Sequence, residues 1–184
     1  KNDQQIKTDG KYLLSTKELN TLNHIKELIK SGISSFKIEG RMKSPEYVGF
    51  VTRLYRKAID KYYNNEDMTI SEEDIYNLKK LYNREFTEGY LFNKSGKELM
   101  NIKTPNHQGV EIGRVIDSYK DKVKIKLTDN LNQNDGIRFK SIDKGMMVNR
   151  LYNSFGDEAI FEDGEEYYLV CLKLYYCMKH GYTN

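Results

Sequence analysis

Several residue types are scarce in this chain of 184 residues, which has no tryptophan, two prolines and two cysteines. The cysteines, Cys171 and Cys177, lie close together near the end of the sequence, at a spacing typical of neither zinc sites nor redox motifs. Two cysteines in a chain of this length indicate a reducing compartment rather than a disulfide scaffold. We therefore expect a cytoplasmic protein whose own residues bind no metal.

Long apolar runs and the motifs of common hydrolases are also absent. No run approaches the roughly 20 residues that a transmembrane helix needs, and no signal peptide is visible, so we expect no membrane partner. The peptidase motifs GxSxG and HExxH are missing, as is a glycine-rich phosphate loop. Because the chain begins with Lys1 rather than methionine, we expect it to be a piece of a longer protein.

Charge is distributed unevenly along the chain. The net charge is +3, but residues 1–65 carry +6 and residues 66–184 carry −3. A basic first third is typical of a surface that faces phosphates or carboxylates, although a solvated helix face gives the same pattern more often.

Residues 35–60 contain the most informative pattern, a strand followed by a capped helix. Apolar and charged residues alternate over residues 36–39, and Gly40 ends this predicted strand. Ser44 and Pro45 then predict the start of an amphipathic helix. The carboxyl end of a strand, just before a helix, is where α/β folds place ligands.

A second strand and helix are predicted before this segment. Residues 11–14 read as a strand, Ser15 and Glu18 fit a capping box, and Gly32 follows the end of the helix. Alternating strands and helices imply a parallel sheet. Two strands cannot form a parallel sheet that is buried on both faces, so we expect the first third to be the tail of a larger α/β domain.

The remaining sequence predicts one more helix and then a β-rich region. Ser71 caps the helix, and an extended segment follows. From residue 105 onward, short alternating segments separated by turns predict a small barrel or sandwich. The expected organisation is therefore an α/β domain over residues 1–92, a linker over 93–104 and a β domain over 105–184.

Several segments resemble the collagenase-like peptidase family, the U-type peptidases of unassigned mechanism. The matching segments are FKIEGRMKSPEYV (36–48), YRKAID (55–60), NREFTEGYL (83–91), PNHQG (105–109), GRV (113–115) and LNQNDGI (131–137). The resemblance implies the last units of a TIM-type α/β barrel followed by a small β-barrel. It covers about residues 12–151 and fades beyond them.

The same resemblance implies two kinds of activity. Some members carry a peptidase name, whereas one branch resembles enzymes that hydroxylate a pyrimidine in tRNA or rRNA with prephenate and a cysteine-held iron–sulfur cluster. The family's cysteines lie upstream of residues 11–14 and are absent here. We therefore expect no cofactor in this chain, and an iron–sulfur cluster only in a preceding segment.

Five residues are candidates for the functional site. Glu39 and Arg41 are the catalytic candidates, as an acid/base and as a fork onto a carboxylate or phosphate. Lys37, Lys43 and His107 are the substrate-binding candidates. The structural alternatives are an ion pair at the barrel rim, with Lys37 neutralising Glu39, and a hinge or inter-domain hydrogen bond made by His107.

The predicted function is that of the carboxyl-terminal part of a peptidase acting on polypeptide, inactive as an isolated fragment. One alternative is an RNA-modifying enzyme. The other is a non-catalytic β-barrel module that binds RNA or protein, in which Lys120, Lys122, Lys124 and Lys126 could contact RNA phosphates. Such a row is more often the wet side of an edge strand.

Overall fold

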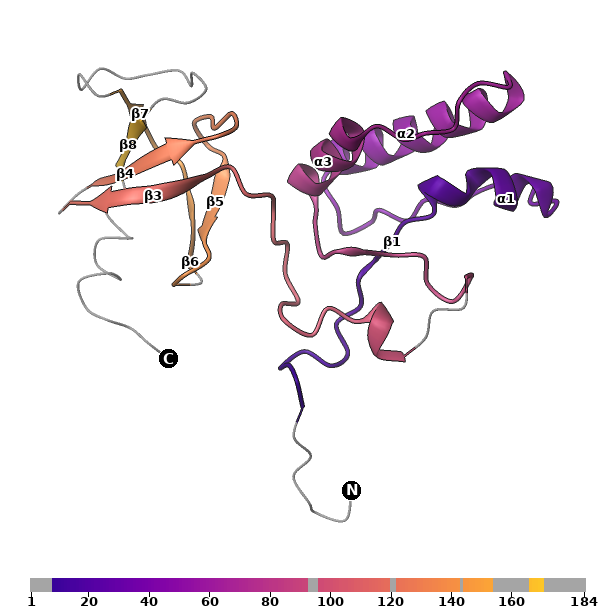
Figure 1. The fold of residues 1–184 in the computed structure, drawn as a ribbon, viewed down its shortest axis with the longest axis horizontal. Coiled ribbons are helices and arrows are strands. Elements are labelled where there is room, and N and C mark those ends of the chain that lie inside the picture. The colour runs from indigo at the N-terminus through magenta and orange to yellow at the C-terminus, as the bar shows by residue number, and fades with distance from the viewer. Residues whose placement is uncertain (1–7, 93–95, 120–121, 143, 154–165, 171–184) are drawn as a thin grey trace, which may run out of the picture. The chain divides into compact units, whose positions relative to one another are not determined.

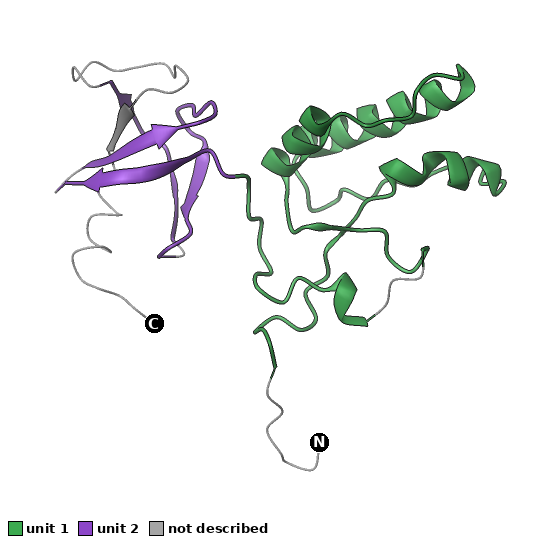
Figure 2. Ribbon diagram, viewed as in Figure 1, with its two compact units in different colours: residues 1–110 green, residues 111–184 purple. Residues whose placement is uncertain are grey.

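The computed structural model describes residues 8–92, 96–119, 122–142, 144–153 and, for the backbone, 166–170. The chain forms two compact units, residues 1–110 and 111–184 (Figure 2). The division falls between residues 110 and 111, so residues 96–104 group with the first unit, and the domain bounds expected from the sequence stay predictions. Within them, Leu99 and Asn101 are buried.

In its described residues the first unit contains three α-helices and two short strands, most of which Figure 1 labels. In chain order the elements are β1 (Glu18–Leu19), η1 (Leu22–His24), α1 (Ile25–Lys30), α2 (Pro45–Tyr63), α3 (Glu72–Leu81), β2 (Phe86–Thr87) and η2 (Gly96–Leu99). Helix α2 packs against both α1 and α3. The core of the unit consists of Leu22, Ile25, Tyr47, Val51, Leu54, Ala58 and Leu78.

The two predicted helix caps at Ser44 and Ser71 are confirmed. The Ser44 hydroxyl accepts a hydrogen bond from the Tyr47 amide at 3.3 Å, and the Ser71 hydroxyl accepts one from the Asp74 amide at 3.1 Å. Each bond satisfies an amide that has no partner within the helix.

The predicted cap at Ser15 is wrong, because β1 occupies the first turn of the expected helix. The backbone amide of Glu18 donates to the Glu85 carbonyl at 2.9 Å, and β1 pairs with β2 in a parallel ladder. The helical segment begins only at η1, and Gly32 follows its end at φ +87° as predicted. Pairing with a distant strand therefore outweighs the local capping signal.

The strands predicted at residues 11–14 and 36–39 are also wrong. Residues 11–14 form a turn, and residues 33–40 belong to neither a helix nor a strand. Phe36 and Ile38 nevertheless pack against the core, as their alternation predicted. An apolar alternation fixes which side chains turn inward, but a strand also needs a neighbouring strand.

The second unit is entirely β in its described residues. Strands β3 (Gly113–Ser118), β4 (Lys122–Leu127), β8 (Glu166–Val170) and β7 (Leu151–Tyr152) form an antiparallel sheet in the order β3-β4-β8-β7. Strands β5 (Gly136–Phe139) and β6 (Lys144–Met147) form a separate hairpin. The described strands form open sheets, so both barrel calls, the TIM-type barrel and the small β-barrel, stay predictions.

One face of strand β4 contributes buried residues to the core of the second unit. Val123, Ile125 and Leu127 are buried, as their alternation with lysine predicted. The expectation that this lysine row lies on an edge strand is wrong, because β4 pairs with β3 on one side and with β8 on the other. Lys120 lies outside the described residues.

Candidate functional site

Three charged side chains from separate segments meet in the first unit. One carboxylate oxygen of Glu18 accepts hydrogen bonds from Arg84 Nε at 2.8 Å and from Lys43 Nζ at 3.3 Å, while Arg84 Nη2 lies 2.7 Å from it. The side chains are 14%, 23% and 15% exposed for Glu18, Arg84 and Lys43. We call these three residues the Glu18 cluster. Because the charges are partly buried, removing one partner leaves the others poorly solvated.

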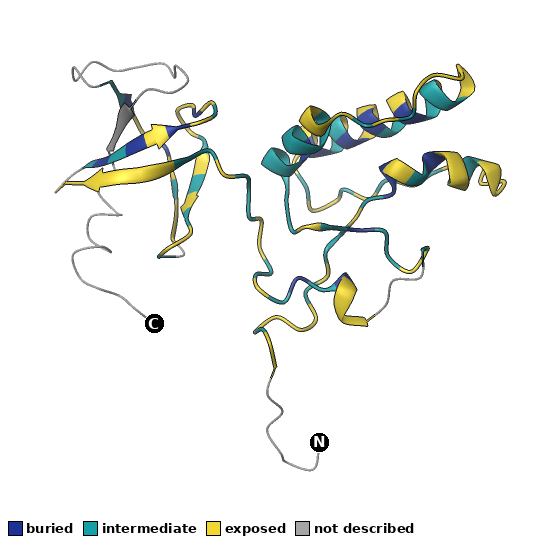
Figure 3. Ribbon diagram, in the orientation of Figure 1, coloured by how far each residue is buried: buried dark blue, intermediate teal, exposed yellow. Residues whose placement is uncertain are grey.

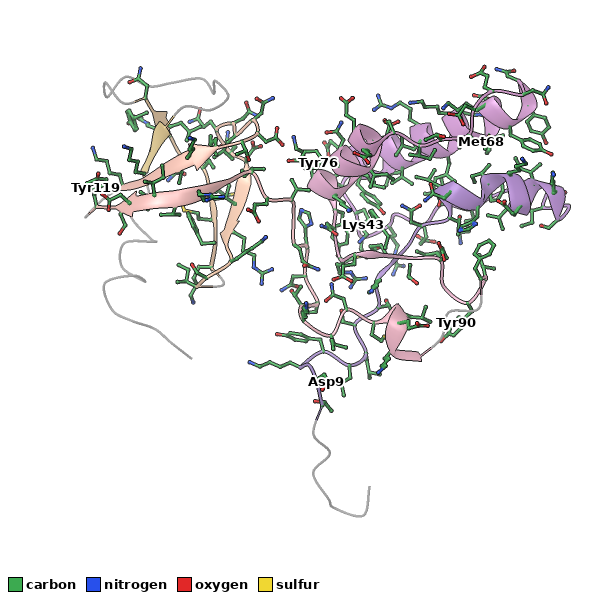
Figure 4. All side chains as sticks on the ribbon, viewed as in Figure 1. Asp9, Lys43, Met68, Tyr76, Tyr90 and Tyr119 are labelled. Atoms are coloured by element: carbon green, nitrogen blue, oxygen red, sulfur yellow. The ribbon has the colours of Figure 1, made fainter. Side chains whose placement is uncertain are left out.

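Lys43 also lies over an aromatic ring, which fixes its side chain from a second direction. Its Nζ atom is 3.0 Å from the ring centroid of Tyr82, a cation–π contact. Tyr82 in turn packs edge-to-face with Tyr47 and stacks on His107, with ring centroids 5.3 Å apart in the stack. Figure 4 labels Lys43 among the side chains of the first unit.

His107 is held by the backbone through its ring. Its Nδ1 atom accepts hydrogen bonds from the Asn83 amide at 2.8 Å and from the Gly109 amide at 3.3 Å. Burial lowers the pKa of His107, and the positive charge of Lys43 acts in the same direction. A neutral imidazole that accepts backbone bonds fastens residues 105–109 to the end of α3. The substrate-binding role of His107 stays a prediction.

Tyr47 stays protonated over the physiological range. Burial raises its pKa to about 12, and the negative charge of Glu18 adds to the effect. The phenol is therefore a packing and hydrogen-bonding group beside the Glu18 cluster, rather than an acid that titrates near neutral pH.

Lys37, Glu39 and Arg41 lie on an exposed segment that ends in the turn closed by Gly40 and Lys43. The Lys37 and Glu39 side chains are 86% and 69% exposed, and their charged groups are 3.4 Å apart. A carboxylate oxygen of Glu39 accepts a long hydrogen bond of 3.4 Å from the Arg41 amide. We call residues 37–42 the rim turn. The charged groups of the rim turn are accessible to solvent. Its backbone is held locally by the hydrogen bond from the Arg41 amide to the Glu39 carboxylate.

The rim turn is tied directly to the Glu18 cluster. The Lys43 amide donates to the Gly40 carbonyl at 2.9 Å, which closes the turn next to the anchored Lys43 side chain. Gly40 packs so closely on Val48 of α2 that an added Cβ would lie 2.4 Å from Val48 Cγ2. The carboxyl-terminal half of the turn is therefore fixed twice, by the Lys43 amide and by the contact of Gly40 with Val48.

The structure thus divides the five predicted site residues into two sets. Lys43 and His107 both contact the ring of Tyr82, whereas Lys37, Glu39 and Arg41 are exposed to solvent. Sequence reasoning missed Glu18, Tyr82 and Arg84. Arg84 lay within a family-like segment that was treated as extended chain, and Glu18 was assigned to a capping box.

The described residues do not fit a metal or iron–sulfur site. Across residues 8–92, 96–119, 122–142 and 144–153, no group of three or more histidine, cysteine, aspartate or glutamate side chains could hold a metal. Cys171 and Cys177 lie outside the described residues. In the described part of the chain, no helix is both long and apolar enough to cross a membrane.

Comparison with known proteins identifies relatives of two kinds. An uncharacterized protease of Methanocaldococcus jannaschii is 33% identical over 96% of this chain and 45% of its own length. A tRNA hydroxylation protein P of Helicobacter pylori is 40% identical over 54% of this chain and 22% of its own length. A collagenase of Porphyromonas gingivalis is 38% identical over 47% of this chain and 24% of its own length.

The chain thus spans less than half the length of these relatives, and no solved structure matches it. The family model described as "Peptidase family U32" matches residues 1–101, which include the whole Glu18 cluster and the rim turn. This match confirms the resemblance seen in the sequence. The chain belongs to peptidase family U32.

Proposed function

We propose that this chain forms part of an enzyme that acts on polypeptide, and that the rim turn contacts the substrate. The observation that carries the proposal is the pairing of an exposed, charged turn with a partly buried anchor, the Glu18 cluster. The family description supports the choice of polypeptide, as does the protease-named relative that aligns with 96% of the chain.

The residues of the rim turn take distinct roles in this proposal. Glu39 acts as an acid/base or accepts a hydrogen bond from a substrate amide. The guanidinium of Arg41 binds a substrate carboxylate or carbonyl oxygen, for which its planar fork is suited. Lys37 neutralises Glu39, consistent with their 3.4 Å separation. Lys43 positions the turn, since its ammonium already contacts Glu18 and Tyr82.

The proposal includes a larger α/β barrel in the cytoplasm, completed by strands outside this chain's described residues. Strands β1 and β2 form a parallel pair, and Leu19 of β1 is 64% exposed. Parallel sheets in globular proteins are covered on both faces, so this pair is expected to gain neighbours in the complete enzyme.

A peptide-binding measurement tests the proposal. The chain is titrated into a labelled gelatin-derived peptide, and affinity is followed by fluorescence anisotropy. Arg41→Ala should weaken binding by at least about tenfold, the cost of one hydrogen bond to a charged group. Lys26→Ala, on an exposed face of α1, is the matched control and should bind like the wild type. Equal affinities for Arg41→Ala and the control would refute a substrate role for the turn.

A second candidate function, RNA modification, is favoured by β4. Lys122, Lys124 and Lys126 lie on the side of β4 opposite its buried residues, so their charges form a row suited to phosphates. The relative named as a tRNA hydroxylation protein supports the same substrate class. Salt-dependent binding of tRNA that is lost when the three lysines are changed to glutamate would favour this function over the first.

A further inference from the structure

The outward side of α2 carries a row of cations that neither proposed site uses. Four basic residues recur at helical spacing there and line an open hollow of about 440 Å³, together with Asp60, Asn64 and Glu66. The four are Arg53, Arg56, Lys57 and Lys61. Figure 3 shows exposed and buried residues alternating along α2, whose other side packs into the core. We call this hollow the α2 groove.

The charge of the α2 groove favours an anionic partner. Its lining holds four cations and two carboxylates, a net charge of +2, which Asp74, paired with Lys57, reduces to +1. Arg53 and Lys61 are eight residues apart, which is about 12 Å along a helix and is room for more than one phosphate of a strand. An extended polyanion therefore fits the row better than a single small anion does.

One ion pair in the groove is of a kind that a phosphate displaces. Arg56 lies 2.6 Å from Asp60, and both side chains are more than half exposed. An exposed pair of this kind contributes little to stability, so exchanging its carboxylate for a phosphate oxygen costs little. Lys57 lies 2.9 Å from Asp74, and this pair is less accessible, because the Asp74 side chain is 19% exposed.

An exposed aromatic residue at the end of α2 distinguishes nucleic acid from an acidic peptide. Tyr63 is 67% exposed and directly precedes Asn64, which lines the groove. Tyr62 packs edge-to-face against it, with ring centroids 5.3 Å apart, which steadies the ring. Cations beside an exposed ring are the combination that binds single strands, through the phosphates and through a stacked base.

We propose that the α2 groove binds the backbone of single-stranded RNA and that Tyr63 stacks on one of its bases. The inference rests on the second candidate function, and it places the RNA contact in the first unit in addition to β4. Arg53, whose guanidinium lies 4.8 Å from the Phe50 ring, is held in position to meet a phosphate at one end of the row.

The experiment measures binding of a short fluorescein-labelled oligouridylate to the full chain by anisotropy at several salt concentrations. The groove variant carries Arg53→Gln and Arg56→Gln. The control carries Lys26→Gln and Lys30→Gln on the exposed face of α1, which removes the same charge. The groove variant should bind at least about tenfold more weakly, with a salt slope smaller by about 1.4, whereas the control keeps the wild-type values. Tyr63→Ala should weaken binding at least about fivefold.

Circular dichroism confirms that each variant keeps its helices, and the remaining outcomes separate the hypotheses. If the groove variant and the control weaken equally, binding is unspecific and the groove is refuted. If only the lysine-to-glutamate variant of β4 loses binding, RNA remains the substrate but the groove is refuted. If the wild type binds no oligouridylate, both the groove proposal and the second candidate function are refuted. If it binds polyglutamate as tightly as RNA, the partner is an acidic polypeptide.

Discussion

The ammonium nitrogen of Lys43 lies 3.0 Å from the ring centroid of Tyr82, so a cation at the end of the rim turn rests on an aromatic ring at the end of α3. The two residues are far apart in sequence and belong to segments that flank α2 and α3. Their contact, together with the bonds of Lys43 and Arg84 to Glu18, links the rim turn to β1 and to the approach to β2.

Loss of the Lys43 ammonium should destabilise the chain measurably. Lys43→Met keeps most of the aliphatic stem but removes both the cation–π contact and the bond to Glu18. We expect the free energy of unfolding to fall by about 1–2 kcal/mol, measured by urea denaturation. Lys37→Met, at a side chain that is 86% exposed, is the control and should change stability by less than about 0.5 kcal/mol. Equal losses of unfolding free energy in Lys43→Met and Lys37→Met would show that Lys43 does not anchor the turn.

Neutralising Glu18 should cost more than removing Lys43. In Glu18→Gln, the charges of Arg84 and Lys43 stay partly buried without their common carboxylate. We expect a loss of roughly 2–4 kcal/mol in the free energy of unfolding, somewhat below the cost for fully buried pairs. Glu39→Gln, on the exposed rim turn, should leave stability nearly unchanged. Equal losses of unfolding free energy in Glu18→Gln and Glu39→Gln would contradict the prediction that the partly buried carboxylate matters more than the exposed one.

Stability should decline in acid partly through His107. The pKa of His107 is lowered in the folded state, so its neutral form is the one that folding favours. Its contribution to stability is therefore fully present above the ordinary pKa of 6.5 and is lost as the pH falls below that value toward the lowered pKa. The difference in unfolding free energy between wild type and His107→Asn should shrink from pH 7.5 to pH 5.5. A difference that stays constant over that range would contradict the assignment.

Two serines provide a matched pair that separates a true helix cap from a false one. Ser44→Ala should destabilise the chain by about 1 kcal/mol, because the Tyr47 amide loses its acceptor. Ser15→Ala should be neutral or slightly stabilising, because the Ser15 hydroxyl is buried with no hydrogen-bond partner among the described residues. Thermal melts of the two variants measure this contrast. A larger loss of stability in Ser15→Ala than in Ser44→Ala would contradict it.

Local signals in the sequence predicted where α2 and α3 begin, whereas contacts between distant residues become apparent only in the structure. Ser44 and Ser71 cap helices through bonds to residues three positions ahead, so short motifs suffice. Residues 36–39 have the right alternation for a strand, but no pattern within them specifies a partner, and the ladder forms between β1 and β2 instead. The alternation of β4 succeeded because it only had to specify which face is buried.

Only part of the candidate site could be predicted, because short motifs do not specify contacts between distant residues. Lys43 stood out because it directly precedes a helix cap, but the residues that fix it come from elsewhere in the chain. Glu18 and Arg84 are 66 positions apart and meet only because β1 and β2 pair in parallel. No spacing rule connects them, so the cluster becomes visible only in the folded chain.

Hydrogen exchange at the Lys43 amide tests the central claim most directly, namely that the Glu18 cluster holds the rim turn in place. This amide donates to the Gly40 carbonyl and closes the turn. In Glu18→Gln, the account predicts exchange at least about tenfold faster than in the wild type under conditions where both chains stay folded, because the turn opens more often. Unchanged exchange at Lys43 in a folded Glu18→Gln variant would show that the turn does not depend on the cluster, and the account would be wrong.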